Sequence, residues 1–334
     1  PESHAISFAI LAYGSAYLKV HRGPEFYASL LNNQPMGFYM PATIVKDAQR
    51  HGIHMLPVCA RESRWVCTVV SNDTVRLGFC VVNGMRKEHG EALVKEREFA
   101  GFDSLDDFKR RVMLSKEELR TLAELGALNC FADHRRAAMW KVEETQYDDL
   151  LGSAHVSGVV NGVSPSRTFS ERSFWRDAKT NPRDACAPQS SESPLLPMSM
   201  PERVKADYTA MNLTTGPHPM KLLRAQLPDI WRASDLRSAR HGATVQIAGN
   251  VICRQRPGTA KGFVFVSLED ETGVSNAIVT PDLFERMRLL LTEEPFLIIE
   301  GRVQNTDNVV LIKAEKIRPL DHEQLIGSES HDFH

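Results

Sequence analysis

The chain has 334 residues, too many for one small core, so two or three domains of about 100–200 residues each are expected. Its 40 lysines and arginines against 42 aspartates and glutamates give a formal net charge of -2, which excludes a histone-like polycation and an acidic tail protein. With 42% hydrophobic and 25% charged residues the composition is that of an ordinary soluble globular protein, so any affinity for nucleic acid must come from local patches.

The six cysteines form no C-x-x-C pair and show no metal-ligand spacing with histidine, which favours a reducing cytoplasm. Apolar runs such as 296–299 fall far short of the ~20 residues that a membrane helix needs, so we expect a protein that is neither secreted nor membrane-spanning. Pro1 leads at once into a helical pattern, which suggests a piece of something longer.

Residues 1–72 are predicted to be mostly helical. Apolar residues recur at spacings of four and three, which predicts an amphipathic first helix with a core-facing stripe. That stripe consists of Ile6, Ile10, Tyr13, Tyr17 and Val20. Pro24 and Pro41 each open a further helix, since proline is favoured at the first helical position, and Gly52 ends the third. A short strand is expected at 53–58.

Residues 73–150 carry many helix start and stop signals. Two Ser-x-x-acid capping boxes, at Ser104–Asp107 and Ser115–Glu118, each mark the beginning of a helix. Gly126 is placed to end the second of these helices in the left-handed conformation. We therefore predict short helices joined by tight glycine turns.

A glycine turn in this segment could hold a backbone phosphate. Gly84 allows close approach, Arg86 and Lys87 add charge, and the helix predicted at 88–97 offers its first amides to an anion. The alternative is an ordinary helix connection with solvated charges. That alternative is serious, because 13 basic against 16 acidic residues give the segment 73–150 a net charge of -3.

Residues 151–205 are rich in serine, proline and glycine and have few periodic apolar positions, which predicts a mostly disordered linker. After it, residues 206–320 are expected to form a helical lead-in and a β-domain. A polar tail, 321–334, follows.

The β-domain is predicted from alternation of apolar residues. Strands at 245–253, 263–268 and 274–280 are followed by a helix beginning at Pro281 and by two strands within 296–317, which is the order of an OB-fold barrel. One face of the first strand should consist of Val245, Ile247, Gly249, Val251 and Cys253.

The first hairpin of this barrel supplies the second candidate site. Arg254, Arg256 and Lys261 flank it, while Phe263 and Phe265 should point away from the buried valines. An OB-fold uses such a surface to stack unpaired bases while cations follow the backbone. Two phenylalanines can equally be packed against a neighbouring element, so both interpretations stay open.

No catalytic or metal-binding residue is predicted. Two-metal phosphoryl transfer needs converging carboxylates, commonly Asp-x-Asp, and the sequence contains none. It also has no Walker-type G-x-x-x-x-G-K-[ST] and no G-x-G-x-x-G. The run Glu269-Asp270-Glu271 is interpreted as a charged turn between strands.

Several motifs, in order, resemble the late fingers region and the following domains of bacterial C-family DNA polymerases. They include residues 1–13 and Asn33-Gln34-Pro35-Met36-Gly37-Phe38-Tyr39, which is similar to the error-prone paralogue of the polymerase III alpha subunit. The surroundings of Gly84 resemble the helix-hairpin-helix region of that family. Residues 254–262 and 268–273 resemble its OB domain, and the ending, 332–334, is also similar.

The resemblance implies a multidomain α+β chain. Its parts would be a helical remnant of the fingers (1–72), a helix-hairpin-helix region (73–150), the linker and a C-terminal all-β OB-fold barrel. It also implies translesion DNA synthesis after DNA damage in the bacterial cytoplasm, with an accessory Y-family-like protein and the sliding clamp as partners. The catalytic aspartates of the family lie in an upstream palm, so the chain alone should be inactive and the Mg²⁺ of the full-length polymerase should bind elsewhere. Duplex DNA would contact Gly84, Arg86 and Lys87, and the template strand would contact the barrel hairpin.

Two other functions remain open from the residues. Barrels of this kind also serve tRNA anticodon recognition, so an RNA-binding module is an alternative. A protein-interaction scaffold, with the barrel and tail docking a partner, is another.

Overall fold

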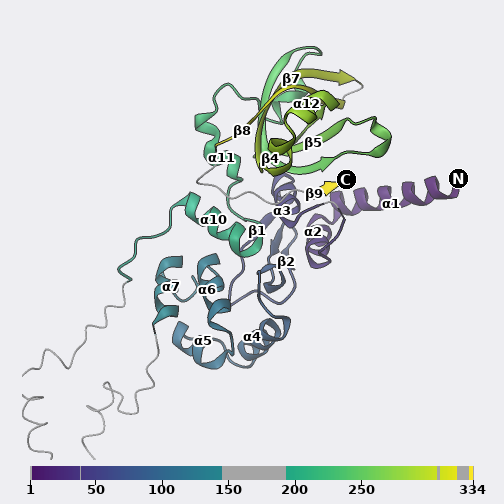
Figure 1. The fold of residues 1–334 in the computed structure, drawn as a ribbon. Helices are drawn as coiled ribbons and strands as arrows, with labels where there is room; N and C mark the ends of the chain where they lie inside the picture. The colour runs from purple at the N-terminus through teal and green to yellow at the C-terminus, as the bar shows by residue number, and fades with distance from the viewer. Residues whose placement is uncertain (1, 38, 145–192, 307–308, 322–330, 334) are drawn as a thin grey trace, which may run out of the picture.

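The computed structural model describes residues 2–37, 39–144, 193–306, 309–321 and 331–333. Figure 1 shows a group of short helices at the bottom, a small sheet with helices in the middle, and a β-barrel at the top. The first helix projects sideways from the middle part.

Helix α1 (Glu2–His21) confirms the predicted first helix, but its apolar stripe is not buried. More than half of the surface of each stripe residue is exposed, namely Ile6, Ile10, Tyr13, Tyr17 and Val20. Only the last turns of α1 meet the rest of the described chain, where Lys19 donates a hydrogen bond to Asp47 across 2.7 Å. The expectation of a core-facing stripe is therefore wrong: the periodicity predicts a helix, whereas burial depends on what packs against it.

Helices α2 (Gly23–Asn32) and α3 (Pro41–Arg50) follow, and each has its proline in the first turn as predicted. They pack around the buried Tyr27, whose hydroxyl donates to Asp47. Beside them lies a three-stranded sheet in the order β1-β3-β2. Its strands are β1 (His54–Leu56), β2 (Thr68–Ser71) and β3 (Thr74–Arg76).

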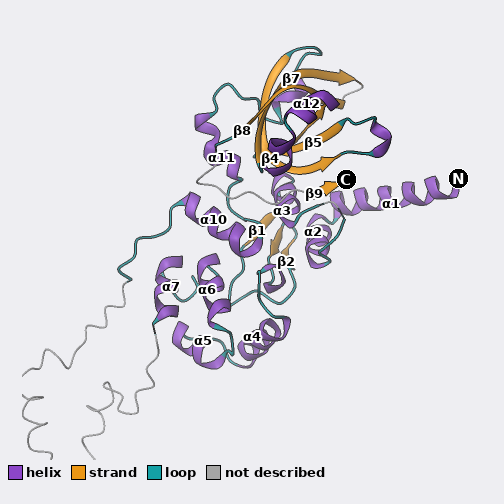
Figure 2. Ribbon diagram, viewed as in Figure 1, coloured by secondary structure: helices purple, strands orange, loops and turns teal. Residues whose placement is uncertain are grey.

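The lower part of the molecule is helical (Figure 2). It consists of the 3-10 helix η1 (Phe79–Val81) and helices α4 (Lys87–Phe99), α5 (Leu105–Arg111), α6 (Lys116–Leu125) and α7 (Arg135–Glu143). The hydroxyl of Ser104 accepts the amide of Asp107, and Ser115 and Glu118 form a complete capping box. Gly126 ends α6 with φ 83°, which glycine adopts without strain. The predicted starts of α5 and α6 and the predicted end of α6 are confirmed, whereas α4 begins one residue earlier and ends two residues later than the predicted 88–97.

Helix α10 (Met200–Met211) begins inside the segment predicted as a linker, most of which lies outside the described residues. Two ion pairs fasten α10 to α7. The buried Arg135 contacts Asp207 across 2.7 Å, and Arg136 contacts Glu202 across 2.6 Å. The two ends of the intervening segment are thus held together.

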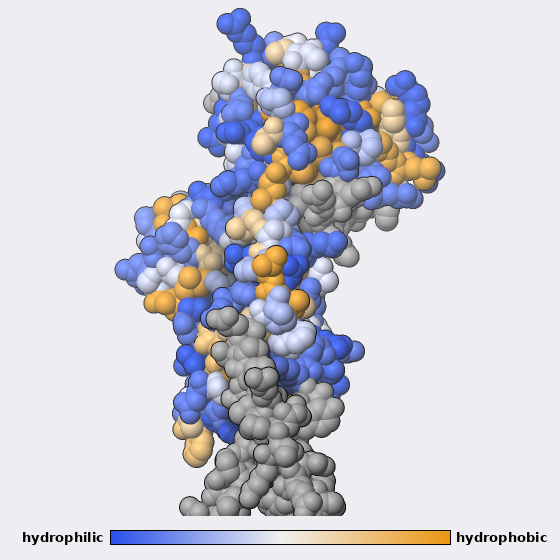
Figure 3. All heavy atoms as spheres, turned by 90° about the vertical axis from the view of Figure 1, so that its left-hand side faces the viewer, coloured by the Kyte–Doolittle hydropathy of each residue, from blue (hydrophilic) through white to orange (hydrophobic). Residues whose placement is uncertain are grey.

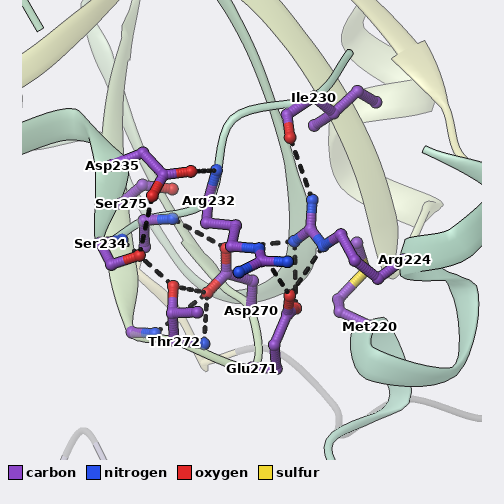
Figure 4. Close-up of polar contacts among 12 residues, drawn as sticks. Met220, Arg224, Ile230, Arg232, Ser234, Asp235, Asp270, Glu271, Thr272 and Ser275 are labelled. Atoms are coloured by element: carbon purple, nitrogen blue, oxygen red, sulfur yellow. Dashed lines mark hydrogen bonds and ion pairs between the residues drawn. The ribbon is translucent and has the colours of Figure 1, made fainter. Parts of the chain in front are cut away.

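A short lead-in of α11 (Pro219–Leu223), η2 (Arg224–Gln226) and η3 (Asp235–Ser238) connects α10 to the barrel. Figure 4 shows the polar contacts between this lead-in and the turn after β5 (Val264–Glu269). Arg224 makes a two-point contact with Glu271, at 2.7 and 3.0 Å, and the backbone amides of Ala233 and Thr272 donate to Asp270. Asp270 and Glu271 form a charged turn between strands, as predicted, and these groups engage both of them. Glu269 is instead the last residue of β5, and both Glu269 and Asp270 are buried rather than at the surface.

The barrel closes because β4 (Thr244–Gln255) pairs with both β5 and β7 (Phe296–Thr306). β5 then pairs with β6 (Val274–Val279), β6 with β8 (Val309–Pro319), and β8 with β7. β9 (His331–Phe333) adds a parallel pairing along β4. Between β6 and β7 the predicted single helix is broken at Met287 into α12 (Pro281–Arg286) and α13 (Arg288–Glu293). The predicted OB-fold order is confirmed.

A β-bulge in β4 changes which side chains face the barrel interior. Val251 pairs with the buried Leu268, but the register shifts before Cys253, which pairs with Ser267. Arg254 consequently pairs with the buried Val266. The expectation that Cys253 shares a face with Val251 is therefore wrong, because the bulge inserts one residue and reverses the alternation.

The barrel rests on α3 through a buried polar joint. Glu269 is 1% exposed, and its carboxylate accepts from Arg50 across 2.8 Å and from Thr43 across 3.3 Å. Lys46 of α3 donates to the carbonyl of Gly216 in the lead-in. Burial raises the pKa of Glu269 and lowers that of Lys46 to about 8.

On the side of the molecule that carries α10 and α11, the surface is mostly hydrophilic, with apolar patches on the barrel (Figure 3).

Candidate nucleic-acid interface

The glycine turn before α4 is exposed. Gly84 has φ 75°, and the space where a Cβ would stand is open. The buried Val82 and Met85 anchor the turn on either side, while Arg86 and Lys87 are exposed to solvent. The structure therefore brings together the three residues predicted to contact a duplex.

The neighbouring amides of this turn are mostly in use. Asn83 donates its backbone amide to Ala210 of α10 across 2.8 Å, and Met85 donates to Val82. The amide of Arg86 donates to Glu118 across 3.1 Å. Contact with a phosphate would therefore depend mainly on the two cationic side chains, because these amides already have acceptors.

Glu118 of α6 sets the electrostatics beneath the turn. Its side chain is 4% exposed and lies 2.8 Å from the Nδ1 atom of His89. Burial alone would raise the pKa of Glu118, but hydrogen bonds from Ser115, Arg86 and His89 outweigh it and lower the pKa to about 2. The buried acid thus stays ionised, and it fixes α6 against the start of α4. The sequence predicted Glu118 only as a capping residue.

The second candidate site is the β4–β5 hairpin of the barrel. Lys261 at its tip is exposed, and Phe263 is 37% exposed. Phe265 is half-buried on the outer face of β5, opposite the inward-facing Val264 and Val266. Both rings are therefore accessible, and a base could stack on either of them.

The two arginines predicted on this hairpin differ in their surroundings. Arg256 is about half exposed, lies over the ring of Phe284 at 4.7 Å and is 3.6 Å from Glu285. Arg254 is instead buried, because the bulge turns it inward, and its guanidinium donates to the carbonyl of Glu294 across 2.7 Å. Arg254 is thus placed to hold the end of α13, away from the outer face.

The structure adds neighbours that the sequence argument missed. Ile278 of β6 pairs with Phe265, and Asn276 pairs with Ser267, whose hydroxyl donates to it across 2.7 Å. These residues extend the outer face of β5 with an apolar side chain and polar groups suited to base edges. The sequence carries no clear signal for them, because residues 274–279 do not alternate between apolar and polar side chains.

The two clusters do not form one site. The glycine turn lies in the lower part of the molecule and the hairpin in the barrel (Figure 1). Among the described residues, no group of three or more His, Cys, Asp or Glu side chains is arranged to hold a metal ion. Within the same residues, no helix is both long and apolar enough to cross a bilayer.

Comparison with known proteins assigns both regions. A family described as a helix-hairpin-helix motif matches residues 52–138, and one described as an OB-fold nucleic acid binding domain matches residues 244–320. The first covers the glycine turn and the second covers the hairpin.

Longer relatives match the entire chain. The error-prone DNA polymerase of Anaeromyxobacter dehalogenans is 36% identical over 100% of this chain and 28% of its own length. Those of Bordetella parapertussis and Pseudomonas paraeruginosa are 38% and 36% identical, over 99% and 100% of this chain and 29% and 30% of their own. The chain thus spans less than a third of the length of these relatives. The resemblance to error-prone DNA polymerases that the sequence motifs indicated is confirmed.

Solved structures match only small parts of the chain and with low scores. Asparaginyl-tRNA synthetase from Pyrococcus horikoshii is 20% identical with a TM-score of 0.25, and the match covers 29% of this chain and 23% of that protein. A putative aspartyl-tRNA synthetase from Leishmania major Friedlin is 19% identical with a TM-score of 0.22, over 25% of this chain and 19% of that protein.

Proposed function

We propose that this chain is the carboxyl-terminal DNA-handling portion of an error-prone DNA polymerase that acts in damage-induced translesion synthesis. The relatives that match the whole chain carry the name error-prone DNA polymerase, and the two matched families are a helix-hairpin-helix motif and an OB-fold nucleic acid binding domain. The observation that carries the proposal is the pair of exposed clusters, one cationic at the glycine turn and one aromatic and cationic on the barrel.

The two clusters would bind different forms of DNA. Arg86 and Lys87, beside the open Gly84, can contact duplex phosphates without reading sequence. Phe263 and Phe265 offer faces on which unpaired template bases stack, while Arg256 and Lys261 follow the backbone. Arg254 has no part in this role because its side chain is buried.

The exposed apolar surface of α1 supports a place within a larger polymerase. A row of apolar side chains this large rarely faces water in a stable monomer, so α1 is suited to pack against further protein. In the longer relatives, the remaining two thirds or more of the chain could supply that protein.

Nucleotide addition is assigned to the rest of the enzyme. We infer that this chain alone does not extend a primer, since its sequence lacks an Asp-x-Asp pair for two-metal chemistry. The Mg²⁺ of the full-length enzyme would bind upstream. An accessory Y-family-like protein and the sliding clamp would be its partners, in the bacterial cytoplasm.

Binding of the purified chain to three labelled ligands tests this function. A primed duplex with a single-stranded template overhang should bind more tightly than duplex or single strand alone, because only it reaches both clusters. The logarithm of the affinity should fall linearly as the logarithm of the salt concentration rises, and the affinity should vary little with the sequence of the DNA. Equal, salt-insensitive binding of all three ligands would contradict the proposal, and primer extension by the chain alone would refute its inactivity.

An RNA-binding module is the second candidate, because the barrel matches a general OB-fold nucleic-acid family rather than a DNA-specific one. Competition distinguishes the two. Folded tRNA should displace primed DNA only at a large excess, whereas displacement at equal concentration would favour RNA. A pure protein scaffold would show no affinity for either ligand at low salt.

A further inference from the structure

A pocket lies where the barrel meets helices α2 and α3. It has a volume of about 390 Å³ and a mostly apolar lining. Phe26 and Leu30 of α2, Ile44 of α3 and Val274, the first residue of β6, contribute to this lining. A volume of this size with mostly apolar walls is typical of a site that buries a small organic group.

The loop before α3 adds an accessible aromatic ring to the pocket. Met36 and Tyr39 of this loop line it, and Tyr39 is 62% exposed. Gln34 fastens the loop to α2, because its side chain donates to the carbonyl of Leu30 across 3.1 Å and accepts the amide of Met36 across 3.3 Å. The stretch 33–39 thus presents a ring at the pocket from a loop that is held in place.

Part of the lining is polar. Asp47 accepts hydrogen bonds of 2.7 Å from both Lys19 and Tyr27, and all three residues line the pocket. Arg50 lines it as well and donates to Glu269. A carboxylate has several lone pairs and a guanidinium has five N–H donors, so this part of the pocket can both accept and donate hydrogen bonds.

The outer face of β5 and β6 leads to the pocket. Three cross-strand pairs follow one another along this face, namely Phe265 with Ile278, Ser267 with Asn276 and Glu269 with Val274. At the third pair Val274 is 41% exposed and lines the pocket, whereas Glu269 is covered by α3. From Ile278 to Val274 is four residues, or about 13 Å. A single strand stacked on Phe265 would therefore reach the pocket within about four nucleotides.

We propose that this pocket receives one unpaired base of the template strand, a role that rests on the proposed function. The base would stack on Tyr39, and its polar edge would face Asp47 and Arg50. A purely apolar occupant, such as a leucine side chain of a partner protein, would cover these two charged groups without offering them hydrogen bonds, which costs free energy. A base has a flat apolar face and a polar edge, so it matches both parts of the lining.

A scan of abasic sites tests the proposal on the whole chain. The ligand is a primed duplex whose template overhang lacks the base, but keeps the phosphate, at one position in each member of the series. At the position that enters the pocket, loss of the base should raise Kd by about 5- to 150-fold, the range for one stacked base. Tyr39→Ala should abolish this penalty at that position, whereas Phe265→Ala should abolish a penalty at a different one.

Three variants show whether the ring itself matters. Tyr39→Ala should weaken binding of the intact overhang by at least about fivefold, while Tyr39→Phe, which keeps the ring, should bind like the unsubstituted chain. Tyr13→Ala is the matched control, because Tyr13 is 75% exposed on the projecting helix α1 (Figure 1), and it should leave Kd unchanged. The salt slope should stay the same in all three, since none of them removes a charge.

The outcomes distinguish the pocket from the barrel surface. If Phe265→Ala weakens binding of the overhang but Tyr39→Ala binds as tightly as Tyr13→Ala, the pocket takes no base, and the proposed function stands without it. Identical abasic profiles for the unsubstituted chain and Tyr39→Ala would have the same meaning. If the chain binds no overhang at all, the proposed function fails and the base pocket fails with it.

Discussion

Arg50 of α3 donates a hydrogen bond of 2.8 Å to Glu269 of the barrel, and so joins two parts of the chain that are more than two hundred residues apart in sequence. The carboxylate of Glu269 is buried, whereas about a fifth of the Arg50 side chain remains exposed. Removal of Arg50 would leave an uncompensated charge inside the joint.

We therefore expect Arg50→Ala to lower the free energy of unfolding by about 2 kcal/mol, since breaking a buried pair from one side costs more than the pair contributes. Urea unfolding measures this. Arg64→Ala is the control, because Arg64 pairs with Glu98 in solvent and should change stability by less than about 0.5 kcal/mol. Equal effects of the two substitutions would mean that the joint does not depend on this contact.

Glu118 should make the helical unit sensitive to acid. Its pKa is lowered in the folded chain, so its stabilisation is complete above the ordinary value of 4.5 and is lost as the pH falls towards about 2. Glu118→Gln should reduce stability at pH 7 by about 3 kcal/mol and flatten the pH dependence between those values. Thermal unfolding across that range measures both effects. Glu117→Gln, an exposed neighbour on the same helix, should leave the profile unchanged.

The glycine turn should contribute to duplex affinity through charge. Arg86→Ala combined with Lys87→Ala is expected to weaken duplex binding and to reduce the slope of log affinity against log salt by about 2, one unit for each phosphate contact. Fluorescence anisotropy over a salt series gives the slope. Lys95→Ala removes an exposed charge farther along α4 and should have little effect. If the double substitution leaves the salt slope unchanged, the glycine turn does not contact the duplex.

The barrel rings should contribute to single-strand affinity without charge. Phe263→Ala and Phe265→Ala are each expected to cost about 1–3 kcal/mol in binding to a single-stranded oligonucleotide, with an unchanged salt slope. Phe99→Ala removes a ring that is 88% exposed on α4 and serves as the control. If both barrel variants bind as tightly as this control, the outer face of β5 does not stack bases.

Substitutions of Arg254 and Lys261 should distinguish a residue that stabilises the barrel from one that binds the single strand. Arg254→Ala should lower barrel stability by about 2 kcal/mol, because it leaves the carbonyl of Glu294 without this buried donor. Lys261→Ala should leave stability unchanged and reduce the single-strand salt slope by about 0.7. Thermal unfolding and a salt series on both variants measure the difference. If Arg254→Ala reduces the salt slope while the protein remains fully folded, Arg254 does contact the single strand.

Local signals predicted most of the fold correctly. The capping box of Ser115 with Glu118 and the left-handed Gly126 depend only on neighbours in sequence, and both stand where they were predicted. The order of strands and helix in the barrel follows from alternation, which the structure also confirms. The predicted contacts of Gly84, Arg86 and Lys87 with DNA remain predictions.

Features set by distant parts of the chain could not be predicted. The bulge before Cys253 depends on how β4 meets β5, so alternation alone placed Arg254 with the exposed cations. The stripe of α1 has helical spacing, yet spacing cannot say which protein surface covers it. The contact of Glu118 with His89 likewise requires two helices to meet, and neither residue signals the other in sequence.

The ion pairs Arg135–Asp207 and Arg136–Glu202 have an evolutionary consequence for the stretch that departs after α7 and returns at α10. Because these pairs hold α7 directly against α10, the placement of the two helices does not depend on the length of chain that joins them in sequence. Natural selection can therefore change that length while both helices keep their positions.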